Sequence, residues 1–252
     1  MYITHPAAPV GTVMDDDFID YKLIPFCKTR GITLFSDSYI SATQFNGKRL
    51  RPILSYPKAM EVSVEAITVA KELGLPGARA GGIAGNEYII NGIRLLAATE
   101  VDIVPGPSQI LAAKALSEIK PEIIGQKIQK ELEGEILPRF ERMGWPVLKP
   151  RAGIDMIIAI PPLFRQADID NPSLLAAITM LRKYRVAMCP CSVFGPAGKY
   201  ALRLVIKQKE GEIAIALDKM RGEGFYWQGE KPTMKDALFL HEELMRLDLT
   251  KL

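Results

Sequence analysis

The stretch TVAKELGLPGARAGG, from Thr68 to Gly82, places one lysine and one arginine eight residues apart among four glycines and one proline. Its surroundings have two interpretations. In the first, residues 63–74 form a helix that ends at Gly74, and Lys71 is a surface charge near the carbonyl end of that helix. In the second, residues 61–68 form a strand and residues 69–77 bend away from it. The local pattern leaves both open.

The second interpretation brings a hydroxyl, an amine and a guanidinium together at one bend. Thr68 and the planar fork of Arg79 suit an anionic phosphate, and the amine of Lys71 beside them can form an imine with a carbonyl. Pyridoxal 5'-phosphate is the cofactor that combines a phosphate with an aldehyde. The bend therefore predicts a pyridoxal phosphate site.

Composition limits the classes of protein to which the chain can belong. It has 252 residues, 48% of them apolar and 24% charged, which is enough for two domains or subdomains. The net charge is only +3, and its basic and acidic residues are interspersed, so we expect no nucleic-acid partner. No leader signal and no apolar run near 18 residues is seen, so we expect no membrane partner.

The cysteines indicate the cellular compartment of the protein and not a metal site. Cys27, Cys189 and Cys191 are odd in number, and their spacing is not that of a metal site. Such usage is typical of a reducing environment, where disulfides are rare. We therefore expect a cytoplasmic protein without a bound metal.

The order of apolar patterns predicts an α/β protein, in which strands and helices alternate and the sheet is mostly parallel. The spacing of apolar residues predicts helices over 15–31, 121–144, 171–185, 211–224 and 233–249. It predicts strands over 32–39, 61–69, 78–85, 155–161 and 200–207. The strand over 78–85 is rich in small residues, so another backbone is expected to approach it closely.

Several blocks together resemble class I/II aminotransferases of fold type I. TVAKELGLPGARAGG resembles their lysine segment, HPAAPVGTV their Asn-Pro-Thr-Gly turn, FSDSYIS their acid-bearing strand end, and SVFGPAGKYALRLVI their C-terminal arginine strand. The stretch FNGKRLRPILSYPKAMEVSVEAI is most similar to LL-diaminopimelate aminotransferase-like sequences. The resemblance covers about residues 2–225.

This resemblance implies a role for each matching residue. Lys71 would form the imine with pyridoxal phosphate and move protons during amino transfer, while Thr68 and Arg79 would hold the phosphate. Asp37 would pair with the pyridine nitrogen and keep the ring an electron sink. Arg203 would bind the carboxylate of the amino acid or 2-oxo acid substrate.

The match to the family also has gaps. Ala8 stands where the family has the asparagine that contacts the 3'-oxygen of the cofactor, and Ile40 stands where it has a tyrosine. Tyr39 is adjacent, but on a strand it would face the other way. The chain also begins at Met1, just before the turn, so the earlier part of the family's large domain is not in it.

We therefore expect the C-terminal part of a fold type I large domain, residues 1–130, followed by an α+β small domain, residues 131–252. The resemblance implies a homodimer. The missing flank implies either a partner chain, such as a separate N-terminal half, or an N-terminal segment that belongs to the same longer chain. Three functions stay open. They are an aminotransferase, a non-catalytic relative that serves in binding or assembly, and an enzyme that uses the lysine imine for decarboxylation or racemisation.

Overall fold

The computed structural model describes residues 1–100, 103–120, 122–166, 170–206, 209, 211–225 and 227. Its contacts divide the chain into two units. One comprises residues 1–129 and 150–154, and the other comprises 130–149 and 155–252. The helix expected over 233–249 lies outside the described residues.

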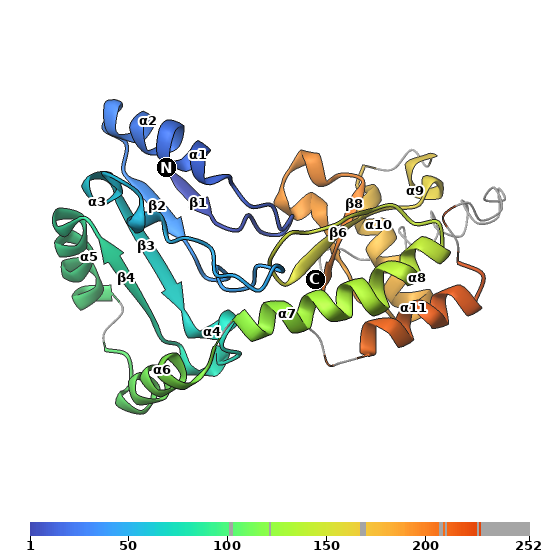
Figure 1. Cartoon of the computed structure of the whole chain (residues 1–252). Coiled ribbons are helices and arrows are strands. Elements are labelled where there is room, and N and C mark those ends of the chain that lie inside the picture. The colour runs from blue at the N-terminus through green and yellow to red at the C-terminus, as the bar shows by residue number, and fades with distance from the viewer. Residues whose placement is uncertain are drawn as a thin grey trace. The chain divides into compact units, whose positions relative to one another are not determined.

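The first unit contains a four-stranded sheet in the order β1-β2-β3-β4 (Figure 1). Its strands are β1 (Tyr2–Thr4), β2 (Leu34–Asp37), β3 (Ser63–Thr68) and β4 (Gly81–Gly85). The first three are parallel, and β4 runs antiparallel to β3. The mostly parallel α/β sheet predicted from the sequence is confirmed.

Apolar residues from the segment between β1 and β2 cover one face of this sheet. The helical run consists of α1 (Asp16–Phe18), a π-helical stretch (Ile19–Leu23) and α2 (Ile24–Thr29). Ile19, Ile24 and Cys27 from this run pack with Leu34 of β2 in one buried cluster. The apolar spacing thus predicted the helix correctly, and Gly31 takes a positive φ just beyond its end.

The remaining elements of this unit are mostly helical. They are a 3-10 turn (Ile53–Ser55), α3 (Ala59–Val62), α4 (Val69–Glu72), a 3-10 turn (Pro76–Ala78), α5 (Glu87–Glu100), α6 (Gly106–Glu118) and α7 (Glu122–Glu131). The second unit continues α7 through a π-helical stretch (Leu132–Ile136) into α8 (Leu137–Arg142). Among the described helices, none has the length and apolar character that crossing a membrane requires.

The glycines of β4 permit the close approach expected from the sequence. A Cβ on Gly85 would lie 2.5 Å from the carbonyl oxygen of Ser63 and 2.6 Å from Cα of Val64. Gly85 also has φ of +145°, a conformation that side chains rarely adopt. The backbone of β3 is therefore the one that approaches β4.

Gly85→Ala should destabilise the protein by about 2 to 4 kcal/mol, because backbone atoms must move to make room for the methyl group. Gly82→Ala on the same strand is the control. Its Cβ would meet nothing closer than Cγ1 of Ile67, at 3.9 Å, so its stability should stay within about 1 kcal/mol of wild type. Urea unfolding measures both, and equal losses would contradict the argument.

The second unit contains an antiparallel sheet in the order β5-β6-β8-β7. Its strands are β5 (Val147–Leu148), β6 (Asp155–Ala159), β7 (Cys189–Pro190) and β8 (Ala201–Val205). Its further helical segments are α9 (Pro162–Gln166), α10 (Pro172–Thr179), a π-helical stretch (Met180–Tyr184), 3-10 turns (Cys191–Phe194 and Pro196–Gly198) and α11 (Glu212–Gly222). Asn171 caps α10 by accepting a hydrogen bond from the N–H of Leu174, as its place before Pro172 predicts.

The segment around Lys71 resolves the two interpretations of the sequence. Ser63–Thr68 is a strand, and only Val69–Glu72 is helical. The interpretation of residues 63–74 as one helix is therefore wrong. Pairing with β2 on one side and β4 on the other satisfies the backbone of residues 63–68, which a local pattern cannot reveal.

Candidate active site

Three parallel strands end at the same edge of the first sheet. Thr4 ends β1 and pairs in register with Asp37, which ends β2. Asp37 pairs with Ala66 of β3, two residues before Thr68. From strand geometry, the Cα atoms of Asp37 and Thr68 are therefore about 8 Å apart. In open α/β sheets, ligands bind at the carboxyl ends of the strands, which is this edge.

Thr68 links the end of β3 to the short helix α4. Its Oγ1 accepts a hydrogen bond from the N–H of Ala70 at 3.2 Å, so it caps the helix. The same hydroxyl donates to the carbonyl of Ala80 at 3.1 Å. Thr68 thus holds together the two ends of the bend over residues 68–80.

Lys71 and Arg79 both lie on this bend with exposed side chains. Lys71 is in α4, three residues after its cap. Arg79 adopts a left-handed backbone conformation, with φ of 48°, and its Nη1 donates to the carbonyl of Pro76 at 3.3 Å. The bend places Thr68, Lys71 and Arg79 on one connection between β3 and β4, as the second interpretation predicts.

The bend is fixed by an apolar contact on its inner side. Val69 of α4 and Leu73, directly after that helix, pack in a buried cluster with Ala112 and Ala115 of α6. Because these residues turn inward, Lys71 between them is left on the solvent side. The sequence determines that Lys71 lies in this short helix, and packing against α6 holds the helix in place.

Asp37 is a partly buried acceptor at the end of β2. The phenol of Tyr2 donates to its Oδ2 at 2.5 Å. The pKa of Tyr2 is raised to about 12, mainly by this hydrogen bond. Burial of the phenol and the negative charge of Asp37 raise it further. The sequence does not predict this contact, because Tyr2 and Asp37 meet only when β1 pairs with β2.

A second carboxylate, missed by the sequence reasoning, lies directly after Lys71. Glu72 is only 3% exposed. Its Oε1 accepts hydrogen bonds from Oγ of Ser41 at 2.9 Å and from the N–H of Ala42 at 2.6 Å. Its Oε2 lies 3.5 Å from Nη2 of Arg49. A charged residue in a short helix gives no signal of burial in the sequence, since its partners are about 30 residues away.

Burial raises the pKa of Glu72 above its ordinary value of 4.5, although the hydrogen bonds from Ala42 and Ser41 and the charge of Arg49 oppose this. A raised pKa means that folding favours the protonated form. The resulting stability is complete below the ordinary pKa and is lost as the pH rises through the raised one.

Glu72→Gln cannot take a charge, so it should not show this loss. We expect the stability of wild type to fall relative to Glu72→Gln as the pH rises from about 4 to about 8. Urea unfolding across this range measures the difference. Glu118→Gln, an exposed carboxylate on α6, should follow wild type. A constant difference between Glu72→Gln and wild type at all pH values would contradict the expectation.

Arg203 belongs to the second unit and lies at the centre of β8. Its Nε is 3.7 Å from Oδ1 of Asp155, and its guanidinium lies 5.5 Å from the centroid of the Phe194 ring. That Nε is buried and has no hydrogen-bond partner among the described residues. The side chain as a whole is 31% exposed, so a carboxylate ligand can reach the part of the guanidinium that does not face Asp155.

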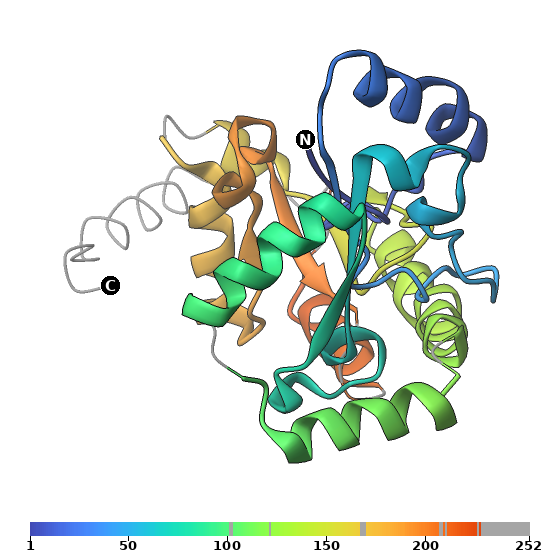
Figure 2. The same cartoon turned by 90° about the vertical axis from the view of Figure 1, so that its left-hand side faces the viewer.

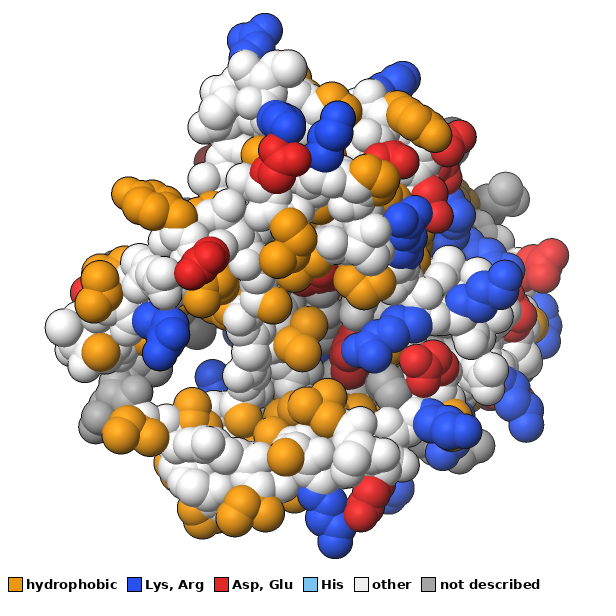
Figure 3. Space-filling model, turned by 60° about the vertical axis from the view of Figure 1, so that its left-hand side comes forward, with side chains coloured by type: hydrophobic (Ala, Val, Ile, Leu, Met, Phe, Trp, Pro, Cys, Tyr) orange, Lys and Arg blue, Asp and Glu red, His pale blue; other side chains and the backbone are white. Residues whose placement is uncertain are grey.

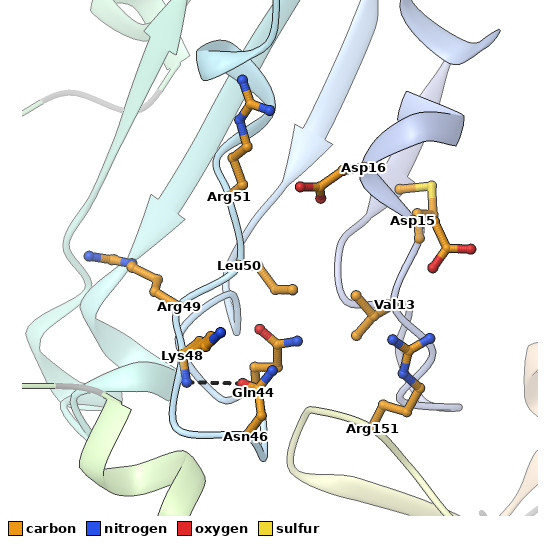
Figure 4. A pocket seen from close by; sticks show the side chains of 11 residues that line it. Val13, Asp15, Asp16, Gln44, Asn46, Lys48, Arg49, Leu50, Arg51 and Arg151 are labelled. Atoms are coloured by element: carbon orange, nitrogen blue, oxygen red, sulfur yellow. Dashed lines mark hydrogen bonds between the residues drawn. The ribbon is translucent and has the colours of Figure 1, made fainter. Parts of the chain in front are cut away.

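The first unit also has a pocket of about 350 Å³, which adjoins the site only through Arg49 among the residues described above (Figure 4). It is lined by Val13, Met14, Asp15, Asp16, Gln44, Asn46, Lys48, Arg49, Leu50, Arg51 and Arg151. Figure 4 shows Asp16 pointing into it while Arg49 and Arg51 point away, and neither Lys71 nor Asp37 lines it. Its charges are mixed, so it does not match a phosphate.

The family model for class I and II aminotransferases matches residues 1–220. The chain belongs to this aminotransferase family. Members of the family use pyridoxal phosphate. The resemblance stated from the sequence is confirmed.

Individual relatives of this aminotransferase-family chain are distant. LL-diaminopimelate aminotransferase 2 of Trichormus variabilis is 22% identical over 89% of this chain and 56% of its own length. The putative aminotransferase AatC of Rhizobium meliloti is 28% identical over 86% of this chain and 52% of its own length. The chain thus spans about half the length of these relatives.

Solved structures show the same fold. Apo-BacF from Bacillus subtilis has a TM-score of 0.80 and 22% identity, over 91% of this chain and 57% of that one. An aminotransferase from Staphylococcus aureus has a TM-score of 0.79 and 19% identity, over 90% and 58%. The fold class predicted from the sequence is therefore confirmed.

Several groups of this aminotransferase-family chain have the chemistry that pyridoxal phosphate requires, although the O–H of Thr68 already donates to the carbonyl of Ala80. An exposed amine, a carboxylate at the neighbouring strand end and a hydroxyl with a guanidinium lie on adjacent connections of one sheet. The two positions at which the family contacts the 3'-oxygen of the cofactor carry other residues here. The N–H of Ala8 donates to Oγ1 of Thr4, and Ile40 is 1% exposed, with its Cδ1 facing Gly153.

Tyr39 does not restore this contact as a strand residue. Strand β2 ends at Asp37, so Tyr39 lies in the following turn and not on the opposite strand face predicted from the sequence. Nor do the described residues contain a group of three or more His, Cys, Asp or Glu arranged to hold a metal ion.

Proposed function

We propose that this protein is a pyridoxal-phosphate-dependent aminotransferase, which moves an amino group between an amino acid and a 2-oxo acid. The bend over residues 68–80 carries this proposal, because Thr68 caps the short helix that presents Lys71 and the bend ends at Arg79. Family membership supports the same activity.

The chain's residues take separate roles in the proposed reaction. Lys71 Nζ binds the cofactor and moves the proton at Cα of the amino acid. Thr68 and Arg79 hold the phosphate, and Asp37 keeps a proton on the pyridine nitrogen. When bound, the cofactor supplies the electron sink that stabilises negative charge at Cα. The hydrogen bond from Tyr2 orients the Asp37 carboxylate for its role.

We assign residues 1–130 to the remaining part of a cofactor-binding large domain and residues 131–252 to a small domain. The fold of the solved aminotransferases and the change of unit near residue 130 support this assignment. We also place the protein in the cytoplasm, because Cys27, Cys189 and Cys191 are all free thiols.

Arg203 is our candidate for the residue that binds the substrate carboxylate. Arg203→Gln should raise KM for the amino acid about tenfold to a hundredfold, since a charge-assisted contact is lost. Binding of pyridoxal phosphate should be unchanged. Steady-state kinetics over a range of amino acid concentrations measures the effect, with Arg182→Gln as a control. If Arg203→Gln both raises KM and loses cofactor binding, this role is contradicted.

Partner chains are also proposed. Large apolar side chains are exposed on α5, α6 and the two strands before them, as Figure 3 shows for one face. They are Ile67, Ile83, Tyr88, Leu95, Leu96, Ile110, Leu111 and Leu116. In Figure 2 no other described element of this unit lies in front of α5. This apolar surface supports association with a second copy or with a separate N-terminal half.

A spectrum of the purified chain with added pyridoxal phosphate tests the proposal. We expect a visible band that shifts when an amino acid is added, followed by transfer of its amino group to 2-oxoglutarate. The band could instead be accompanied by loss of CO2 or by racemisation, without transfer of the amino group. The protein would then be assigned another reaction of the same cofactor. If no band forms, either with this chain alone or after the N-terminal half of a relative is added, the proposal is refuted.

The second candidate is a non-catalytic relative that acts in binding or assembly. Two observations favour it. Ala8 and Ile40 supply no group to the cofactor, and the apolar surface suits a protein partner. Self-association occurs under both functions, so it does not separate them. The spectrum does, because this candidate predicts no specific adduct at Lys71.

A further inference from the structure

Glu72 is a buried carboxylate that the proposed reaction does not use. Its two donors to Oε1, the hydroxyl of Ser41 and the N–H of Ala42, are both held within hydrogen-bond distance. The charges around it are Arg49, which pairs with Oε2, and Glu122 of α7, which opposes it. Burying a carboxylate costs stability, so a hydrophobic or neutral residue would serve the fold at least as well.

The two segments that Glu72 joins are those that carry the proposed cofactor contacts. On one side is α4, a helix of only four residues that includes Lys71. On the other side is the turn over residues 39–42, which begins two residues after Asp37. A single helical turn has little stability of its own, so its position depends on tertiary contacts.

The contacts that position α4 come from two directions. Val69 and Leu73 pack on α6 and fix its apolar side. The hydrogen bonds of Thr68 tie the start of the helix to Ala80. The hydrogen bonds to Glu72 are also directional, and they tie the helix to Ser41 and Ala42 instead.

We propose that Glu72 is a positioning residue: its Oε1 joins the turn carrying Lys71 to the turn following Asp37, and so sets the spacing of amine and carboxylate. This inference rests on the proposed function for its link to the cofactor. Joining the two turns is a property of the chain without cofactor.

Three variants separate the effect of the length of the Glu72 side chain from the effect of its charge. Glu72→Gln keeps an acceptor oxygen at the same reach but has no charge. Glu72→Asp keeps the charge but is one methylene shorter, and Glu72→Ala removes both. If Oε1 positions the turn, Glu72→Gln should match wild type in local hydrogen exchange and in cofactor affinity, while Glu72→Asp should match Glu72→Ala in both.

The first readout is hydrogen exchange in the cofactor-free chain. In Glu72→Ala and Glu72→Asp we expect the amides of residues 69–73 and of residues 38–42 to exchange on the order of tenfold faster than in wild type. The two segments should change together, and Glu72→Gln should restore both. Ser41→Ala, which removes one of the two donors, should give a smaller increase.

The second readout is the affinity for pyridoxal phosphate, followed by borohydride trapping at Lys71. We expect Glu72→Ala and Glu72→Asp to raise the Kd on the order of tenfold and Glu72→Gln to leave it near wild type. Ile24→Val, a change in the buried core of the same unit, is the control for general destabilisation. It should lower Tm without changing either readout.

Several results would overturn the inference. They are exchange in Glu72→Ala that matches wild type, exchange that rises in only one of the two segments, and a Glu72→Asp variant that keeps both readouts. An unchanged Kd in Glu72→Ala would also overturn it. If wild type itself forms no adduct at Lys71, the proposed function fails, while the exchange data still decide whether Glu72 joins the two turns.

Discussion

Lys71→Ala should lose the covalent pyridoxal phosphate adduct and lower the rate of amino transfer by at least about a thousandfold. Two functions are removed together, since no other group on the bend can bind the cofactor covalently or move the proton at Cα. The side chain is exposed, so its removal should change stability little. Absorbance with added cofactor, followed by borohydride reduction and mass mapping, measures the adduct.

Lys114→Ala is the matched control for Lys71→Ala. Lys114 is also exposed on a helix of the first unit, where its contact to Glu118 is a weak one at 4.0 Å. The control should keep the adduct and the rate. An adduct that persists in Lys71→Ala, or that maps to another lysine in wild type, would assign the chemistry elsewhere and refute the proposed role.

Asp37→Asn should lower the rate of amino transfer by about a hundredfold or more, because a neutral amide cannot stabilise a protonated pyridine nitrogen. The covalent adduct at Lys71 should still form. This separation of binding from rate distinguishes Asp37 from Lys71. Single-turnover kinetics with an amino acid measures it, and Asp17→Asn at the exposed start of α1 is the control.

A second measurement on Asp37→Asn needs no cofactor. The carboxylate of Asp37 holds the pKa of Tyr2 at about 12, so the variant should lower that pKa toward the ordinary value of 10. Ultraviolet titration of the phenol reports it. If the pKa of Tyr2 falls but the rate stays at the wild-type level, Asp37 is a structural acceptor and not a cofactor contact.

The sequence by itself predicted the elements that rest on local periodicity. A β-rich apolar run marked β2, and helical spacing marked the segments around α2, α10 and α11. The eight-residue spacing of Lys71 and Arg79 predicted a cofactor site on the bend, which stays a prediction. These features are local, since they depend on which side chains a few neighbouring residues can bury.

Only the tertiary structure decided whether residues 63–68 are strand or helix, because their hydrogen bonds go to β2 and β4 rather than to each other. It likewise decided that Ile40 is core and that Tyr2 contacts Asp37. Glu72 is the clearest case. Ser41 and Ala42 lie about 30 residues before it, and no local pattern can reveal a buried charge whose partners are brought to it by the sheet.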